Sequence, residues 1–174
     1  TERLLGSLGV ALVPVESPDE AELVFINTCA FIQPATEESV RTIAQAIADI
    51  EELPKRPLLA VAGCLVGRYH AEDLAPELPE VDLWLDNSDL EAWPAMLARK
   101  LGLPEPTVPG RILSTGPSYA WLKISDGCRH ACSFCAIPNI RGGHRSHCKD
   151  MIVREARALL DQGVKELNLV AQDL

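Results

Sequence analysis

Strand-like and helix-like segments alternate over residues 1–101, and this alternation narrows the possible folds more than any other feature. Short apolar runs are typical of buried strands, and apolar residues at helical spacing are typical of helices that pack on one side. Six segments form the pattern: strands at 23–26, 58–62 and 81–85, and helices at 34–52, 71–77 and 88–101. Strands joined through helices form a parallel sheet covered on both faces. We therefore predict an α/β, doubly wound parallel sheet domain over residues 1–101, with Ser88 as the cap of its last helix.

A second unit with the same alternation follows a connection rich in proline and glycine. Residues 102–118 contain four prolines and three glycines, which is typical of a linker. The segments beyond it are a strand, a cysteine-rich loop, a helix and another strand, at 119–124, 125–149, 150–162 and 167–170. One strand–helix repeat and one further strand are too little to close a barrel or complete a sheet. We therefore expect residues 119–174 to be an incomplete domain.

Charge is distributed unevenly between these two parts. Residues 1–118 carry 8 Lys and Arg against 19 Asp and Glu, whereas residues 119–174 carry 8 against 6. The acidic first part argues against extensive contact with nucleic-acid phosphates, because nucleic-acid binders normally present a basic face. A basic protein partner would suit it better, and an ordinary solvated acidic surface is the alternative.

Cysteine usage indicates a reducing compartment. Four of the six cysteines lie within residues 128–148, and the chain shows neither a secretory signal nor an apolar stretch long enough to cross a bilayer. Clustered cysteines in a cytoplasmic protein favour metal binding or catalysis over disulfides. The chain begins with Thr1 rather than Met, which suggests that it starts inside a longer protein.

Cys128, Cys132 and Cys135 form a C-x3-C-x2-C pattern directly after a predicted strand, and we call them the cysteine triplet. Cysteine thiolates are the usual ligands of iron–sulfur clusters. Three ligands for a four-iron cluster leave one iron open, which can bind the amino and carboxylate groups of S-adenosylmethionine (SAM). A zinc site is the alternative, with its fourth ligand drawn from His130, His144, His147 or Cys148. Structural zinc sites, however, usually consist of two ligand pairs.

The chain resembles the radical-SAM methylthiotransferases, which insert sulfur at an unactivated carbon and methylate it. The cysteine triplet carries the resemblance together with stretches of both parts of the chain: 119–128 (YAWLKISDGC), 137–142 (IPNIRG), 166–173 (ELNLVAQD), 26–32 (INTCAFI) and 62–64 (AGC). The resemblance implies two 4Fe-4S clusters and SAM as cofactors. It also implies that residues 119–174 begin a radical-SAM (β/α) barrel.

Site residues follow from the resemblance position by position. The cysteine triplet would hold the radical-generating cluster, Phe134 would lie near the SAM adenine, and Gln172 with Asp173 would contact SAM at the end of the last strand. No side chain is assigned as a catalytic acid or base. Basic residues around the loop could offset the negative charge of the cluster: Arg129, Arg141, Arg145 and Lys149.

Cys29 and Cys64 would be two of the three ligands of an auxiliary cluster that delivers sulfur. Each follows a predicted strand, and neighbouring parallel strands end at the same sheet edge, where doubly wound folds bind ligands. The alternative is that each is a small buried apolar residue. The third ligand of the family lies before Thr1, so the auxiliary cluster lacks a ligand in this chain.

Other departures from the family pattern concern the loop and the carboxyl end. Where the family usually shows Ser-Arg-Pro, this chain has Ser146-His147-Cys148, which leaves Cys148 without a family role. The rest of the barrel and a small binding domain would follow Leu174.

Two substrate classes occur in this family. One subgroup modifies an aspartate of a small-subunit ribosomal protein, and the other modifies an isopentenyl-adenosine of tRNA. The sequence around Cys29, 119–124 and 137–142 is more similar to the first subgroup, and the acidic charge favours a basic protein substrate. A flavodoxin or ferredoxin-like electron donor, a monomeric state, a cytoplasmic location and no membrane association are also expected. A non-catalytic zinc module is the rival from another functional class.

Overall fold

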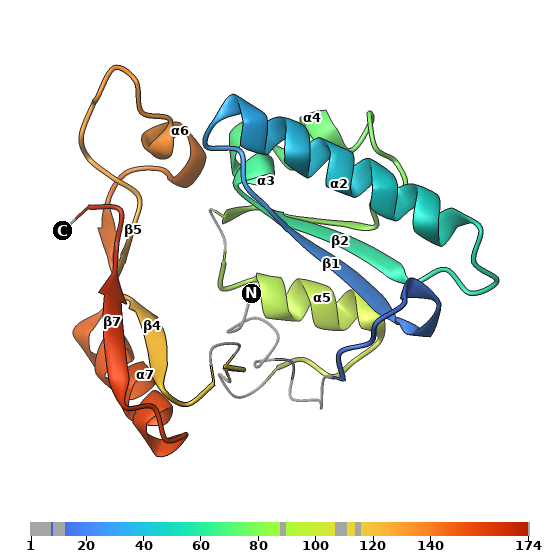
Figure 1. The fold of residues 1–174 in the computed structure, drawn as a ribbon. Helices are drawn as coiled ribbons and strands as arrows, with labels where there is room; N and C mark the ends of the chain where they lie inside the picture. The colour runs from blue at the N-terminus through green and yellow to red at the C-terminus, as the bar shows by residue number, and fades with distance from the viewer. Residues whose placement is uncertain (1–7, 9–12, 88–89, 107–110, 114–115, 174) are drawn as a thin grey trace. The chain divides into compact units, whose positions relative to one another are not determined.

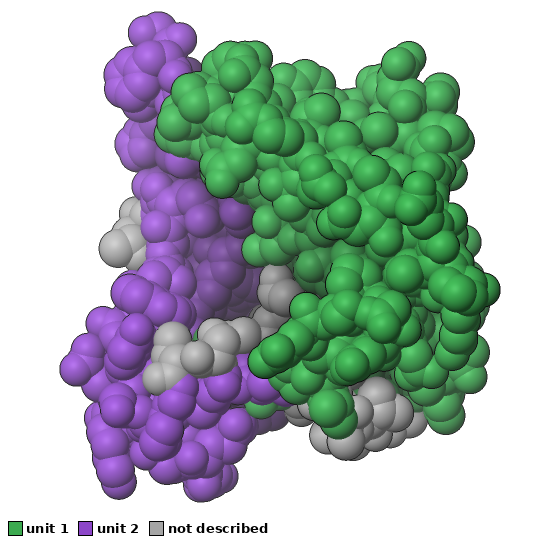
Figure 2. Space-filling view, turned by 45° about the vertical axis from the view of Figure 1, so that its right-hand side comes forward, with its two compact units in different colours: residues 1, 3–111 green, residues 2, 112–174 purple. Residues whose placement is uncertain are grey.

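The structure is a computed structural model that describes residues 8, 13–87, 90–106, 111–113 and 116–173. The chain forms two compact units, coloured green and purple in Figure 2. Unit 1 extends to Arg111, and unit 2 runs from Ile112 to the carboxyl end. Both units contain parallel strands joined through helices, so the predicted α/β class and parallel sheet are confirmed.

Unit 1 is built on a parallel sheet of three strands in the order β1 (Leu23–Thr28), β2 (Leu58–Gly63), β3 (Leu83–Leu85) (Figure 1). The register pairs Leu23 with Leu58 and continues to Thr28 and Gly63, so β1 and β2 end level with each other. Successive β2 residues point to opposite faces, and the four residues from Leu59 to Ala62 are completely buried. A strand buried on both faces has to be apolar throughout, as this one is.

Helices cover the two faces of this sheet. On one face, α2 (Gln33–Glu51) and α3 (Cys64–Tyr69) share a core with Leu59 and Val61. On the other face, α5 (Trp93–Leu101) packs against Ala60 and Ala62. Two short helical segments complete the unit: η1 (Pro18–Glu20) and α4 (Ala71–Leu74). The three-stranded sheet is therefore the middle layer of unit 1, with helices on both faces.

Two sequence predictions for unit 1 were wrong in detail, and one helix was not predicted. The helix expected from residue 88 begins at Trp93, with Pro94 in its first turn and Ala92 in the cap position, while Ser88 lies outside the described residues. The helix expected at 71–77 is only the short α4. The helix α3 was not predicted, because Gly63 turns the chain from strand to helix without a polar cap.

Unit 2 contains the parallel pair β4 (Tyr119–Lys123) and β7 (Glu166–Val170), with α7 (Lys149–Asp161) between them in sequence. Ala120 and Leu122 pack with Leu159 of the helix and with Val164. The predicted strands and helix agree with these elements to within about one residue, as boundary definitions allow. Three short elements of the cysteine-rich loop were not predicted: β5 (Ser125–Asp126), α6 (Ile137–Arg141) and β6 (Arg145–Ser146).

The described residues within 103–118 form no helix or strand. None of the described helices combines the length and apolar character needed to cross a membrane.

We predict that Gly63→Ala destabilises the chain by about 3 kcal/mol, because strain and a backbone clash add. Gly63 has φ +103°, and a Cβ there would lie 2.4 Å from the Thr28 carbonyl oxygen. Gly102 also has positive φ (+68°), but a Cβ would meet nothing within 4 Å. Gly102→Ala is therefore the matched control, with an expected loss of about 1 kcal/mol from strain alone. Urea unfolding measures both, and equal losses would contradict the close approach.

Candidate functional site

Cys29 and Cys64 lie one residue beyond the paired ends of β1 and β2. Because the register joins Thr28 to Gly63, the two cysteines follow neighbouring strands at the same edge of the sheet. Neither forms a disulfide, and Cys29 is exposed and Cys64 half-buried, so neither is a fully buried apolar residue. The strand pairing bears out the expected placement, while their role as cluster ligands stays a prediction.

Buried hydroxyl groups fix the backbone at this edge. The Thr28 hydroxyl donates to the Ala62 carbonyl (2.6 Å) and accepts from the Leu65 N–H (3.2 Å), so it joins the ends of both strands. The Ser39 hydroxyl of α2 donates to the Cys29 carbonyl (2.8 Å) and accepts from the Cys29 N–H (3.1 Å). Buried hydroxyl groups therefore hold the main chain at Cys29 and on either side of Cys64.

Asn87 is a residue of this edge that sequence reasoning missed. It follows β3, is 8% exposed, and its Nδ2 lies 4.0 Å from Cys64 Sγ. An amide N–H at a sulfur ligand is one of the groups that tunes an iron–sulfur cluster. The sequence could have indicated Asn87 through its position two residues beyond β3, because the carboxyl ends of parallel strands meet at one edge of the sheet.

The cysteine triplet lies on one loop of unit 2. The N–H of Cys128 donates to the Gly142 carbonyl (3.3 Å), the N–H of His130 donates to Cys128 Sγ (3.4 Å), and the N–H of Cys135 donates to the Cys132 carbonyl (3.1 Å). All three thiols are free; Cys132 is exposed and the other two are half-buried. Across the part of the chain that the structure describes, no three Cys, His, Asp or Glu side chains are grouped closely enough to hold a metal ion.

The donor chemistry of this loop nevertheless fits an iron–sulfur cluster. Thiolates are soft ligands that suit iron–sulfur clusters, and the triplet offers three of them without a competing disulfide. Two of the histidines considered for a zinc site, His130 and His147, lie beside carboxylates. A cluster bound here has to draw the three thiolates together.

Asp173 joins the end of the last strand to the cysteine loop. Its side chain is 8% exposed; Oδ2 accepts the backbone N–H of Arg129 (3.3 Å) and lies 3.4 Å from Arg129 Nε, while Oδ1 lies 3.3 Å from His130 Nε2. Desolvation works to raise the pKa of this carboxyl, but the Arg129 N–H and the charges of His130, Arg129 and His144 outweigh it. The pKa of Asp173 is therefore lowered from its ordinary value of 3.8.

Gln172 and Phe134 are the other two residues for which SAM contact was predicted. The side-chain carbonyl oxygen of Gln172 is buried and has no hydrogen-bond partner within the described structure. Phe134 is 90% exposed. A buried acceptor without a donor and an aromatic ring in water are both unfavourable, and a bound ligand would relieve both.

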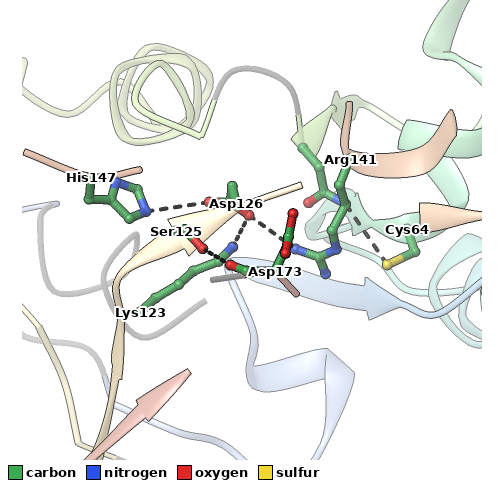
Figure 3. Close-up of polar contacts among 8 residues, drawn as sticks. Cys64, Lys123, Ser125, Asp126, Arg141, His147 and Asp173 are labelled. Atoms are coloured by element: carbon green, nitrogen blue, oxygen red, sulfur yellow. Dashed lines mark hydrogen bonds and ion pairs between the residues drawn. The ribbon is translucent and has the colours of Figure 1, made fainter. Parts of the chain in front are cut away.

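Two of the four basic residues of the loop lie beside carboxylates of the chain. Arg129 pairs with Asp173, and Arg141 lies 3.5 Å from Asp126. Asp126 is a buried carboxylate beside two cations, Lys123 and Arg141, and the His147 ring (Figure 3), and sequence reasoning missed it because an aspartate before Gly127 reads as an ordinary turn residue. Cys148 is a free, exposed thiol in the cap position of α7.

Comparisons with known proteins cover the whole chain. An uncharacterized protein family, UPF0004, matches residues 1–86. Proteins named "Ribosomal protein uS12 methylthiotransferase RimO" are similar over the full length: 69% identical over 174 residues in Nitratidesulfovibrio vulgaris strain DP4 and 62% in Oleidesulfovibrio alaskensis. The protein of that name from Aquifex aeolicus is 48% identical over 99% of the chain. The chain spans about 40% of the length of the first two relatives and 38% of the third.

We predict that Asp173 stabilises unit 2 above pH 3.8 and that this contribution is lost as the pH falls through the lowered pKa of the folded state. The folded carboxyl binds its proton more weakly than the unfolded one, so stability rises with pH in this window. Asp173→Asn should remove the contribution. The difference in unfolding free energy between the two proteins should be positive near neutral pH and shrink below pH 3.8.

Urea unfolding across pH tests this, with Asp161→Asn, an exposed acid of α7, as the control for net charge. A difference that is constant with pH, or that grows as the pH falls, would show that the Asp173 pKa is not lowered.

Proposed function

We propose that the chain belongs to the methylthiotransferase family and forms part of a radical-SAM enzyme that methylthiolates an aspartate of the small-subunit ribosomal protein uS12. This proposal rests on the 69% identity, over all 174 residues, with a protein named "Ribosomal protein uS12 methylthiotransferase RimO". The net charge of −11 over residues 1–118, from 8 basic and 19 acidic residues, suits a basic protein substrate.

In this proposal unit 2 carries the radical chemistry. Its β4–α7–β7 unit would be the start of a (β/α) barrel, and the loop after β4 lies where barrel enzymes place their active sites. Cys128, Cys132 and Cys135 would hold one 4Fe-4S cluster. Cys29 and Cys64 of unit 1 would hold an auxiliary cluster, with a third ligand predicted to precede Thr1.

When bound, the first cluster supplies the electron that cleaves SAM and the auxiliary cluster supplies the sulfur. The chain's own residues orient SAM and exclude water. The buried Gln172 carbonyl would accept a hydrogen bond from the SAM amino group, and the exposed Phe134 ring would pack on the adenine. Asp173 would hold the loop against the end of β7 through Arg129 and His130.

A flavodoxin or ferredoxin-like donor would provide the electron, and we propose a cytoplasmic monomer. The full-length protein, loaded with both clusters and given SAM and a reductant, should increase the mass of uS12 by one methylthio group on an aspartate. Modification of tRNA in place of uS12 would contradict the proposed substrate.

We predict that the cysteine triplet binds about four irons per chain, with sulfide, after anaerobic reconstitution. The measurement uses a chain in which Cys29→Ala and Cys64→Ala remove the other thiols of interest. Adding Cys132→Ala should abolish iron uptake, because a ligand is lost, whereas Cys148→Ala should leave uptake unchanged. One zinc and no sulfide would support the zinc module instead.

We predict opposite effects on stability and SAM binding at Gln172. Gln172→Met should raise the unfolding free energy of the chain by about 1 kcal/mol, because it removes a buried acceptor without a donor. It should weaken equilibrium SAM binding to the reconstituted protein, because the acceptor for the amino group is gone.

Phe134→Ala should change stability by no more than about 0.5 kcal/mol, since the ring is 90% exposed, and should also weaken SAM binding. Leu160→Ala, at a 51% exposed position of α7, is the control for an exposed apolar side chain. SAM affinity that is unchanged in both variants would exclude these two contacts.

A further inference from the structure

Asp126 places a carboxylate in a buried position beside Lys123, Arg141 and His147. The residue is 7% exposed. Its Oδ1 accepts from Lys123 Nζ and lies 3.5 Å from Arg141 Nη1, and its Oδ2 lies 3.5 Å from His147 Nε2. Figure 3 shows these three side chains around Asp126. His147 Nε2 is itself buried and has no hydrogen-bond partner among the described residues, so the carboxylate is the charged group that it faces.

These contacts join the two ends of one loop. Lys123 is the last residue of β4, before the loop that carries the cysteine triplet. Arg141 ends α6 and His147 follows β6, both beyond the triplet. The Asp126 carboxylate, at the start of the loop, therefore contacts Arg141 and His147 in the segment that follows the cysteine triplet.

The backbone closes at the same place. Asp126 pairs with Arg145 across the short antiparallel ladder, and the His147 N–H donates to the Ile124 carbonyl (2.9 Å). Gly127 has φ +70°, and a Cβ there would lie 2.4 Å from the Gly143 carbonyl oxygen, so only glycine allows this approach. Two thiols of the triplet are half-buried and one is exposed, whereas the Asp126 carboxylate is buried. The base of the loop is thus closed by a buried carboxylate, backbone hydrogen bonds and a close backbone approach at Gly127.

We propose that Asp126 is a positioning residue that closes the base of the cysteine loop, so that the triplet can converge on one cluster. Lys123 and Arg141 are 29% and 25% exposed, and without the carboxylate their charges would repel each other in a poorly solvated place. The identity of the bound cluster rests on the proposed function; the closure of the loop does not.

The first test is limited trypsin digestion of the metal-free chain, with cleavage after Arg129, Arg141 and Arg145 followed by mass spectrometry. Asp126→Asn should accelerate cleavage at these loop sites by about tenfold, because the base of the loop opens more often. Cleavage after Arg154 and Arg157 of α7 should keep its rate, which shows that the unit stays folded. Asp161→Asn is the control for loss of one negative charge, and Asp126→Glu, which keeps the charge, should restore part of the protection.

If Asp126→Asn prevents folding, Arg141→Gln opens the same contact from the returning segment and should also accelerate cleavage after Arg145. Loop cleavage no faster than in Asp161→Asn would overturn the proposal.

The second test is anaerobic reconstitution with iron and sulfide. Asp126→Asn should bind less iron than the wild type and show an altered cluster absorption spectrum, with partial recovery in Asp126→Glu. Faster loop cleavage with unchanged iron binding would overturn the positioning role. A wild-type chain that binds no iron would refute the proposed function, and the cleavage rates would then decide the loop closure alone.

Discussion

Parallel strand pairing is the constraint on which both candidate sites depend. In unit 1 the level ends of β1 and β2 put Cys29 and Cys64 after paired residues, and the Thr28 and Ser39 hydroxyls then lock the main chain. In unit 2 the pairing of Lys123 with Val170 brings the start of the cysteine loop beside Gln172 and Asp173. Residues far apart in sequence become neighbours in each case because strands that run the same way end at the same edge.

The sequence predicted those parts of the fold in which apolar residues repeat. The runs at β1 and β2 and the periodicity of α2 and α7 identified these elements, because burial on a sheet or a helix face leaves a regular pattern. The start of α5 was misjudged, since Pro94 fixes the first turn regardless of the apolar pattern before it. The helix α3 was missed because a glycine with positive φ, a three-dimensional requirement, begins it.

The candidate site, like the fold, could be predicted from the sequence only in part. Cysteine spacing and strand ends identified the thiols, but the partners of the loop could not be found from sequence. Asp126 and Asp173 matter because of side chains that reach them from residues 129–147, and such contacts leave no local pattern. They also change the expected electrostatics. Arg129 and Arg141 were predicted to offset cluster charge, yet each lies beside a carboxylate of the chain, so the loop is closer to neutral than its arginines suggest.

The direct passage from β2 into α3 limits where the length of the chain can change. Gly63 ends the strand and Cys64 begins the helix, so no spacer residue separates the sheet core from the thiol. An insertion here would rotate every later residue of α3 away from its buried partners and carry the sulfur off the edge. Length changes in related chains should therefore collect in connections such as residues 52–57 or 102–106, while this junction keeps its length.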